Sequence, residues 1–281
     1  MLHSDVAAGL ELCRASHWNQ LSRDWECFLN LNPNGCRVAV KADRVVGTVV
    51  TLRYPDGKGI NGFGWIAMVL VAPEERRRGI GSELMREALS CLSDLAMIRL
   101  DATPDGHAVY QKLDFVDEYG LIRMEAPSAI RQVYGHSGPT RLMVEADLPR
   151  VLEMDLQVFG VDRGRLLKWM FDGAREYARV LVRDGEIVGY IFGRHGFKYE
   201  HLGPVIAEDY PAAEQLLVTS LGNNGGKRFI LDASCHDPNW TQLLESIGFK
   251  ELRSFIRMYR GENLNPGTPE KQYAILGPEF G

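Results

Sequence analysis

The chemically most distinctive residues of this sequence lie in a short segment that combines three consecutive arginines with two glycines. Arg76 to Arg78 precede Gly79 and Gly81, between an apolar run that ends at Val71 and a run with helical periodicity. The free amides and positive dipole end of a helix favour an anion, and glycine lets a phosphate approach the backbone. Three arginines oppose that dipole unless an anion compensates them. The segment therefore predicts an anion site rather than a solvated basic turn.

Two common nucleotide-binding motifs do not fit this segment. A P-loop requires GxxxxGK followed by Ser or Thr, and no Lys-Ser or Lys-Thr pair follows these glycines. A dinucleotide-binding fingerprint requires a third glycine where Leu84 stands. The pattern that remains is RxxGxG, formed by Arg76, Gly79 and Gly81 between a strand and a long helix.

This pattern resembles the phosphate loop of the GCN5-related N-acetyltransferase (GNAT) family. The later segment HAVYQKLDF is similar to the family signature A-x-x-Y-x-K-x-G-F, with Tyr110 in the tyrosine position and Phe115 at its end. Asp114 stands where the family commonly has glycine, and Asp105 where many members have asparagine. The departure at Asp114 puts the local turn between helix and strand in question more than the chemistry, because aspartate tolerates a left-handed backbone better than most residues.

The resemblance implies acetyl-CoA as co-substrate and no metal. In the family the loop and the first helical turn hold the pyrophosphate, while the preceding strand pairs with the pantetheine arm and supplies an amide to the oxyanion. The residues so implied to bind the cofactor are Val69, Leu70, Val71, Arg76, Arg77, Arg78, Gly79, Ile80, Gly81 and Ser82.

Acetyl transfer also needs a proton for the departing thiolate and a neutral amine. The resemblance implies that Tyr110 is the acid, and an ordinary tyrosine pKa near 10 keeps its hydroxyl protonated at neutral pH; a packed helix aromatic is the alternative. The preceding strand, GWIAMVLV, has no carboxylate to act as base. Asp101 on the next strand is our candidate, with a water chain or one of Asp24, Glu26 and Asp56 as alternatives.

Three aromatic residues fall where family members shape the acceptor site. They are Trp18, Trp25 and Tyr54, which we assign to substrate binding, although aromatics at such places also serve in packing. The seven histidines show no metal-ligand spacing, which agrees with the absence of a metal requirement.

An internal repeat defines the elements that must position these residues. RVAVKADRVVGTVV from Arg37 aligns without gaps with RVLVRDGEIVGYIF from Arg179, an offset of 142 residues. Further on, LDAT from Leu100 corresponds to LDAS from Leu231, and Ile122-Arg123-Met124 corresponds to Ile256-Arg257-Met258. Several pairings in the same order indicate a duplicated unit.

The repeat predicts two tandem GNAT-like domains of α/β (α+β) class, each with a central, mostly antiparallel twisted sheet flanked by helices. Residues 1–126 form the catalytic domain, 127–139 a polar linker, 140–260 the second domain and 261–281 a tail. In the first domain we expect helices at 5–16, 20–29, 81–94 and 106–113, and strands near 36–42, 45–54, 63–71, 97–102 and 116–124. The second domain gains a strand at Arg141 to Glu145, which the first has only as the stub Met1 to His3. The tail, with three Pro and four Gly, needs no regular structure and is either frayed or folded across a groove.

The second copy has lost the chemical motifs of the first. Its corresponding segment, YEHLGPVIAEDYPAAEQLLVTSL, lacks an arginine cluster and a glycine pair, and Leu244 or a neighbour replaces the tyrosine. We therefore expect a degenerate domain that binds no pyrophosphate and builds one wall of the acceptor site or an interface.

Composition narrows the class of function. A chain of 281 residues suits about two domains. Its 32 basic and 37 acidic residues give a net charge of -5 at pH 7, which argues against binding nucleic acid. No apolar run reaches the length of about 18 residues that a membrane span needs, and no signal peptide is evident. Five widely spaced cysteines predict neither disulfides nor zinc, so we expect a cytoplasmic protein.

We therefore predict an acetyl-CoA-dependent N-acetyltransferase that acts on an amine of a small molecule or peptide by direct attack. A non-catalytic acyl-CoA sensor or scaffold is the alternative, motivated by the missing base and the degenerate copy. A third option, aminoacyl-tRNA-dependent transfer, is disfavoured by the acidic pI. A homodimer remains open.

Overall fold

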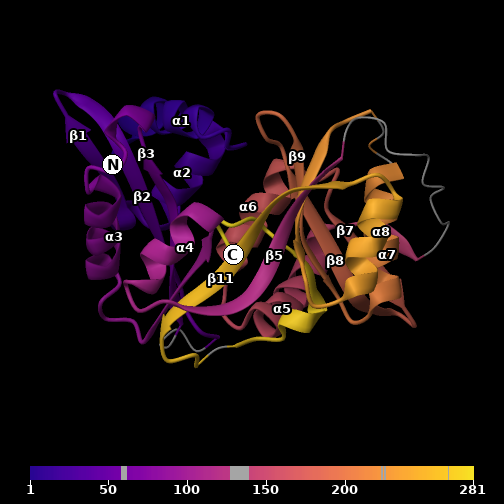
Figure 1. The fold of residues 1–281 in the computed structure, drawn as a ribbon. Coiled ribbons are helices and arrows are strands. Elements are labelled where there is room, and N and C mark those ends of the chain that lie inside the picture. Colours follow the sequence, from indigo (N-terminus) through magenta and orange to yellow (C-terminus); the bar gives the residue numbers. More distant parts are fainter. Residues whose placement is uncertain (58–61, 127–138, 223, 225, 265) are drawn as a thin grey trace.

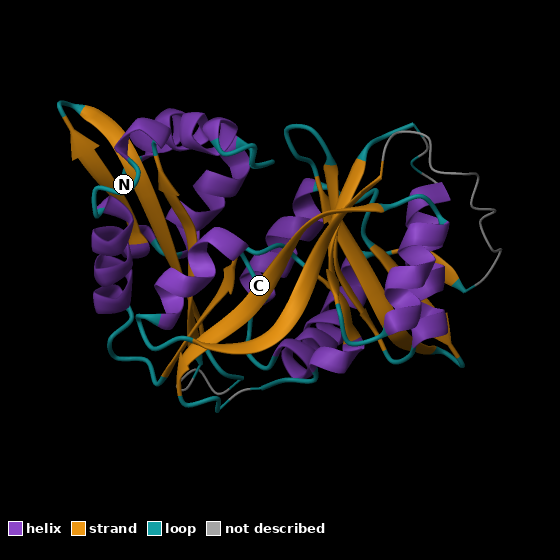
Figure 2. Ribbon diagram, viewed as in Figure 1, coloured by secondary structure: helices purple, strands orange, loops and turns teal. Residues whose placement is uncertain are grey.

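The fold is built around one mixed sheet that runs through both halves of the chain (Figure 1). It was obtained as a computed structural model, which describes residues 1–57, 62–126, 139–222, 224, 226–264 and 266–281. In this part of the chain the sheet has twelve strands in the order β1-β2-β3-β4-β11-β5-β10-β12-β9-β8-β7-β6. Helices pack against it in both halves (Figure 2). The mixed α/β class predicted from the sequence is confirmed.

The N-terminal half follows the predicted order of elements. Its helices are α1 (Val6–Ala15), α2 (Ser22–Leu31), α3 (Ile80–Cys91) and α4 (Pro104–Gln111). Its strands are β1 (Cys36–Lys41), β2 (Arg44–Tyr54), β3 (Phe63–Val71), β4 (Met97–Ala102) and β5 (Val116–Ala126). The expected stub Met1 to His3 is no strand: the amino group of Met1 donates to the Cys36 carbonyl, and a short 3-10 turn covers His3–Asp5.

The C-terminal half repeats this arrangement. Its helices are α5 (Leu148–Phe159), α6 (Gly164–Gly173), α7 (Tyr210–Gly222) and α8 (Pro238–Ser246). Its strands are β6 (Thr140–Leu142), β7 (Arg179–Arg183), β8 (Glu186–Arg194), β9 (Glu200–Ala207), β10 (Phe229–Ser234), β11 (Lys250–Gly261) and β12 (Gln272–Ile275). Strand β6 is shorter than the predicted Arg141 to Glu145, because a 3-10 turn begins at Glu145. The predicted linker lies outside the described residues except for Pro139.

The two hairpins that revealed the repeat share a backbone irregularity. The ladder between β1 and β2 shifts register at Ala39/Val40, and the ladder between β7 and β8 shifts at Leu181/Val182. These positions are equivalent at the offset of 142 residues found in the sequence. A bulge bends a strand and increases its twist, so each hairpin curves over its half in the same way.

The final strands of the two repeats are exchanged between the halves. Strand β4 pairs antiparallel with β11 of the C-terminal half, and β10 pairs antiparallel with β5 of the N-terminal half. Strands β5 and β11 also pair with each other, and they cross the middle of the molecule side by side (Figure 1). Each half therefore completes its sheet with a strand from the other, an arrangement that the predicted boundaries at 126 and 140 did not include.

Two equivalent buried ion pairs fix the exchanged strands. Arg257 on β11 donates to both carboxylate oxygens of Asp101 on β4, at 2.8 and 2.9 Å. Arg123 on β5 donates in the same way to Asp232 on β10, at 2.7 and 2.8 Å. The aspartates come from the LDAT and LDAS segments and the arginines from the two Ile-Arg-Met segments. Equivalent residues of the two repeats therefore make equivalent contacts between the halves.

The tail is ordered, contrary to the expectation that it needs no regular structure. Strand β12 inserts between β9 and β10 and pairs antiparallel with both. Residues 276–281 then run between the two halves, where Phe280 is fully buried and stacks on Phe28 of α2 with ring centroids 4.7 Å apart. A single hydrophobic cluster joins residues of both halves around this point. The tail therefore belongs to the core that unites the halves.

Candidate active site

A cavity lies at the junction of the halves and encloses about 600 Å³ of empty space, including its mouth. Its walls come from the segment after α1, from β3, from the end of β4 with α4, from the exchanged strands β5 and β11, and from the tail. The site is thus assembled from both repeats.

Strand β3 offers this cavity a free edge. It pairs with β4 only at Gly64↔Ile98 and Trp65↔Arg99, after which the two strands splay apart. On its other side the ladder to β2 shifts register so that Met68 and Val69 oppose a single residue. A bulge leaves one residue outside the ladder. Met68 has a left-handed backbone, with φ of 54°, and both residues line the cavity.

Tyr110 faces the same cavity from α4. Its ring packs edge-on against Phe115, and Gly106 leaves room for it, since a Cβ atom there would lie 2.8 Å from Tyr110 Cε2. Burial raises the pKa of Tyr110 to about 12. The hydroxyl therefore remains protonated at neutral pH and is able to donate a proton. Asp114 adopts the left-handed conformation that glycine commonly provides, with φ of 64°, so the turn is kept despite the substitution.

The predicted phosphate loop forms the start of α3, at the far end of β3. Gly79 caps the helix in the left-handed region with φ of 87°, and no side chain caps the N-terminus. A Cβ atom on Gly79 would meet nothing within 4 Å, and one on Gly81 would meet only Val71 at 3.7 Å. The open space above the backbone suits a ligand rather than protein packing.

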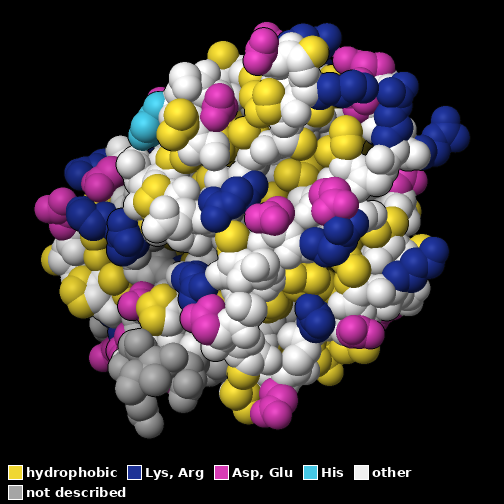
Figure 3. All heavy atoms as spheres, turned by 90° about the vertical axis from the view of Figure 1, so that its left-hand side faces the viewer, with side chains coloured by type: hydrophobic (Ala, Val, Ile, Leu, Met, Phe, Trp, Pro, Cys, Tyr) yellow, Lys and Arg dark blue, Asp and Glu magenta, His cyan; other side chains and the backbone are white. Residues whose placement is uncertain are grey.

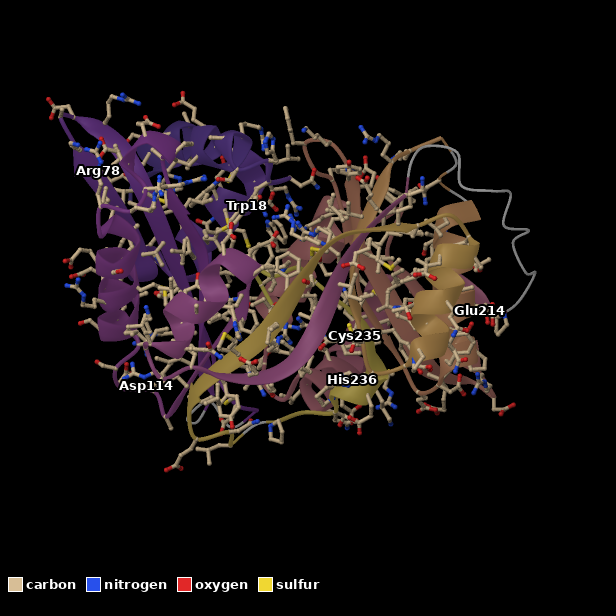
Figure 4. The ribbon with its side chains drawn as sticks, viewed as in Figure 1. Trp18, Arg78, Asp114, Glu214, Cys235 and His236 are labelled. Atoms are coloured by element: carbon tan, nitrogen blue, oxygen red, sulfur yellow. The ribbon has the colours of Figure 1, made fainter. Side chains whose placement is uncertain are left out.

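The three arginines of the loop are exposed. Arg78 lies 3.3 Å from Glu75, which also accepts from Lys41, and Arg76 donates to the Val71 carbonyl at 3.2 Å. Basic and acidic side chains are interspersed over this end of the molecule (Figure 3). Arg78 lies at the outer end of the N-terminal half, whereas Trp18 lies toward the other half (Figure 4). The loop and the cavity are therefore separate along the length of β3.

Asp101 lines the cavity, yet it is not free to accept a proton. Both of its oxygens accept from Arg257, which also donates to the Tyr119 hydroxyl at 2.6 Å. Burial raises the pKa of Asp101, and Arg257 opposes that shift. The pairing argues against Asp101 as the base. The alternatives Asp24, Glu26 and Asp56 do not line this cavity.

The structure separates the three predicted acceptor-site aromatics. Trp18 lines the cavity. Trp25 does not, because it is fully buried under α1 and packs against Phe28. Tyr54 is also buried, and its hydroxyl donates to the Phe280 carbonyl at 2.8 Å. The prediction is therefore wrong for Trp25 and Tyr54 as lining residues: one is a core residue and the other anchors the tail.

A carboxylate that the sequence analysis missed comes from the tail. Glu279 lines the cavity and accepts from Gln20 at 3.0 Å and from Arg194. Burial alone would raise the pKa of Glu279, but the charges of Arg194 and Arg123 oppose that shift, and the pKa is lowered. Glu279 is therefore ionised at neutral pH. A glutamate two residues from the end of a Gly- and Pro-containing segment gives no periodic signal by which sequence reasoning finds it.

In the C-terminal half each equivalent feature is changed. The bulge of β9 falls on Gly203 and Pro204, so proline, which lacks an amide hydrogen, stands where Val69 stands in β3. Asp209 places its own carboxylate at the start of α7, where it accepts from the Ala212 amide at 2.9 Å. Leu244 stands in the place of Tyr110, because the Phe249 amide donates to the Leu244 carbonyl as the Phe115 amide donates to the Tyr110 carbonyl.

The opening between the splayed strands is also filled in the second half. Strands β9 and β10 pair in parallel over three residues and then diverge, as β3 and β4 do. The tail strand β12 occupies this divergence. The edge that β3 leaves free is thus covered in β9 by the chain itself.

Comparisons with known proteins agree with this description. Residues 8–115 match the Acetyltransferase (GNAT) family, and residues 151–274 match an Acetyltransferase (GNAT) domain. Holothin acyltransferase of Pseudoalteromonas sp. (strain SANK 73390) is 27% identical over 95% of this chain and 88% of its own length. The uncharacterized N-acetyltransferase YitH of Bacillus subtilis (strain 168) is 26% identical over 77% of this chain and 76% of its own.

Solved structures share the fold. A putative acetyltransferase from Pyrococcus horikoshii covers 100% of this chain and 94% of its own with a TM-score of 0.82 at 24% identity. A tandem GNAT protein from the clavulanic acid biosynthesis pathway covers 92% of this chain and 95% of its own with a TM-score of 0.65 at 15% identity.

The chain belongs to the GNAT family, carries two GNAT copies in tandem, and is an acyltransferase. No helix in the described ranges is long and apolar enough to cross a membrane.

Proposed function

We propose that the protein is an acetyl-CoA-dependent N-acetyltransferase that transfers the acetyl group directly to an amine of a small molecule or peptide. The observation that carries this proposal is the cavity in which the free, bulged edge of β3 meets the Tyr110 hydroxyl. The same strand leads to the arginine and glycine loop at the start of α3. An extended co-substrate with an anionic end and a thioester end matches these two places.

The loop residues suit the diphosphate of coenzyme A. The first turn of α3 directs free amides into the open space above Gly79 and Gly81, and Arg76 to Arg78 supply charge beside it. The free edge of β3 from Ile66 onward is available to pair with an amide-containing arm. The thioester of the bound co-substrate would supply the activated acyl carbon.

The residues at the cavity then divide the reaction among them. The amine nitrogen attacks the thioester carbonyl, a carbon–nitrogen bond forms, and the carbon–sulfur bond breaks. We assign the stabilisation of the developing oxyanion to a backbone amide at the Met68–Val69 bulge, which would donate a hydrogen bond to it. Tyr110 donates its hydroxyl proton to the leaving sulfur, and the proton of the amine leaves through water. Asp101 positions β11 through Arg257 rather than acting as base.

We further propose that residues 1–126 form the catalytic unit, completed by β11, and that residues 140–260 form the non-catalytic unit. Pro204, Asp209, Leu244 and the inserted strand β12 all support a second unit without co-substrate. A cytoplasmic location is supported by the five cysteines, which are all unpaired.

A thiol-release assay with acetyl-CoA and a panel of amines tests the proposal. We expect Tyr110→Phe to lower kcat by about 10²- to 10⁴-fold, the usual contribution of general acid catalysis. Tyr210→Phe, on α7 of the other half, is the matched control and should keep full activity. Full activity of Tyr110→Phe would refute the acid role.

Calorimetry tests the co-substrate site separately. Replacing Arg76 and Arg78 together by Ala should weaken the affinity for coenzyme A by about tenfold or more, because two charge-assisted phosphate contacts are lost. Arg183→Ala, an exposed arginine of the second half, is the control. An unchanged affinity of the double variant would contradict the assignment of the loop.

A further inference from the structure

We propose that the amine acceptor also carries a carboxylate, as an amino acid does, and that Arg253 binds this carboxylate. The inference rests on the proposed function and names the substrate class of that same cavity. It arises from the ionisable groups at the cavity wall, whose charges do not balance locally.

Arg253 forms no ion pair with any residue that the structure describes, and the charge of Asp232 acts on it only from a distance. Arg253 lies on β11 directly across from Arg123 on β5, because Leu252 is bulged out of the ladder. Both guanidinium groups lie over the ring of Phe255, at 5.3 Å for Arg123 and 5.7 Å for Arg253. Like charges directly opposite on paired strands repel each other.

Of these two arginines, only Arg123 forms hydrogen bonds with the neighbouring carboxylate, which is that of Asp232. Arg123 holds both oxygens of Asp232, and His201 Nε2 also lies 2.9 Å from that carboxylate. In the described part of the chain Arg253 makes no hydrogen bond or ion pair, although it lines the cavity and is half-buried. Desolvation and the charge of Arg123 lower its pKa. A partly buried guanidinium in this position is stabilised by an anion brought by a ligand.

The opposite imbalance exists at another wall of the same cavity. Arg194 is shared by two carboxylates, since it donates to Asp24 at 2.8 Å and also to Glu279. Both oxygens of Asp24 accept hydrogen bonds, the second from the Leu21 amide at 2.6 Å. Burial lowers the pKa of the neighbouring His201, so this histidine adds no charge at neutral pH. Burial raises the pKa of Asp24, while Arg194 and the Leu21 amide oppose that shift, so two carboxyl groups share one guanidinium at this wall.

Among the described residues the cavity wall thus has one guanidinium without an ion pair, and two carboxyl groups that share another guanidinium. Asp101 with Arg257 and Asp232 with Arg123 are balanced pairs, which leaves Arg253 and Glu279 to face a ligand. A molecule with a protonatable amine and a single negative group complements this pattern. A guanidinium binds a carboxylate in a planar, bidentate fashion, and one unpaired guanidinium matches one negative charge. The phosphates of the co-substrate have their own site at α3, at the far end of β3.

Matched acceptors test the inference. We would compare each of the common amino acids with its carboxamide, which keeps the amine but removes the negative charge, in the thiol-release assay. For an accepted amino acid we expect kcat/KM to exceed that of the carboxamide by about 10- to 100-fold, mostly through KM. Arg253→Gln should remove this preference, so that the ratio of kcat/KM for the amino acid to kcat/KM for its carboxamide falls close to one. Arg260→Gln, on the same strand and half-exposed, should keep the preference.

A binding measurement separates this inference from the proposed function. Calorimetry with N-acetylated amino acids and their amides, in the presence of coenzyme A, requires no turnover. If the acids bind more tightly than the amides and Arg253→Gln removes this difference, the inference is supported. This holds even if no amine releases thiol in the activity assay, because that result would overturn only the proposed reaction. Preference for carboxamides, or an acid preference that survives in Arg253→Gln, overturns the inference.

Discussion

The buried pair of Asp101 and Arg257 allows a test that separates a structural role from a catalytic one. In Asp101→Asn the guanidinium of Arg257, on β11, loses its counter-charge in a place without solvent access, because the side chains are 0% and 2% exposed. Breaking a buried pair in this way costs about 3–5 kcal/mol. For a chain of this size that corresponds to a fall in Tm of about 6–20 °C.

Removing both partners should reverse most of this loss. The double variant Asp101→Leu with Arg257→Met fills the space with apolar side chains, and such replacements of buried pairs are about neutral in stability. The Tyr119 hydroxyl would lose its bond from Arg257, which costs about 1 kcal/mol. We therefore expect the double variant to lie within about 2 kcal/mol of the parent protein and the pair to show strong coupling in a double-mutant cycle.

Urea unfolding gives the stabilities, and thiol release at a temperature at which all variants are folded gives the activities. If Asp101 only positions β11, the double variant should keep activity within about tenfold of the parent. If Asp101 is the base, the double variant should be stable but about 10²- to 10⁴-fold slower. That second result, or a double variant as unstable as the single one, would refute our reasoning. Asp232→Asn, in the equivalent pair, serves as the stability control.

Three further predictions concern single positions. Burial raises the pKa of Tyr110 to about 12, above the ordinary tyrosine value near 10. The contribution of the protonated hydroxyl to the free energy of unfolding is therefore complete below about pH 10 and is lost as the pH rises toward about 12. Between about pH 8 and 11 the denaturation midpoint of Tyr110→Phe should fall less than that of the parent protein. Gly79→Ala should lower the free energy of unfolding by about 1 kcal/mol, because Gly79 has a φ of 87°. Gly81→Ala should leave the unfolding midpoint unchanged and weaken the affinity for coenzyme A. If the two variants had equal effects on the unfolding midpoint and on the affinity measured by calorimetry, this prediction would be wrong. Phe280→Ala should cost about 3–5 kcal/mol in urea unfolding, since the ring is buried against Phe28, and a change below 1 kcal/mol would mean that the tail is not part of the core.

Local features were predictable from the sequence because local physics decides them. Alternating apolar residues and tight polar turns marked both hairpins, and helical spacing marked α3. Asp114 lies in the left-handed region, which aspartate tolerates better than most residues. The alignment that placed Leu244 opposite Tyr110 matches their shared backbone hydrogen bonds.

Features that depend on partners far along the chain were not predictable. A strand carries the same alternation whichever neighbour it pairs with, so the sequences of β5 and β11 contain no sign of their exchange. Trp25 and Tyr54 have the residue types of a binding site, and only the packing around them decides that they are buried. The short apolar run of β12, between glycines and prolines, gives too little periodicity to distinguish a strand from a loop.

The exchange of the final strands has a consequence for how this protein is made and how it can change. Strand β4 needs as its neighbour a strand that begins at Lys250, so the sheet of the first copy stays open on the ribosome until residues 250–261 have been synthesised. For the same reason, a deletion of the second copy would remove a strand, the partner of Asp101 and one wall of the cavity. A gene for the first copy alone would therefore encode an incomplete sheet, so the two copies have to be inherited together.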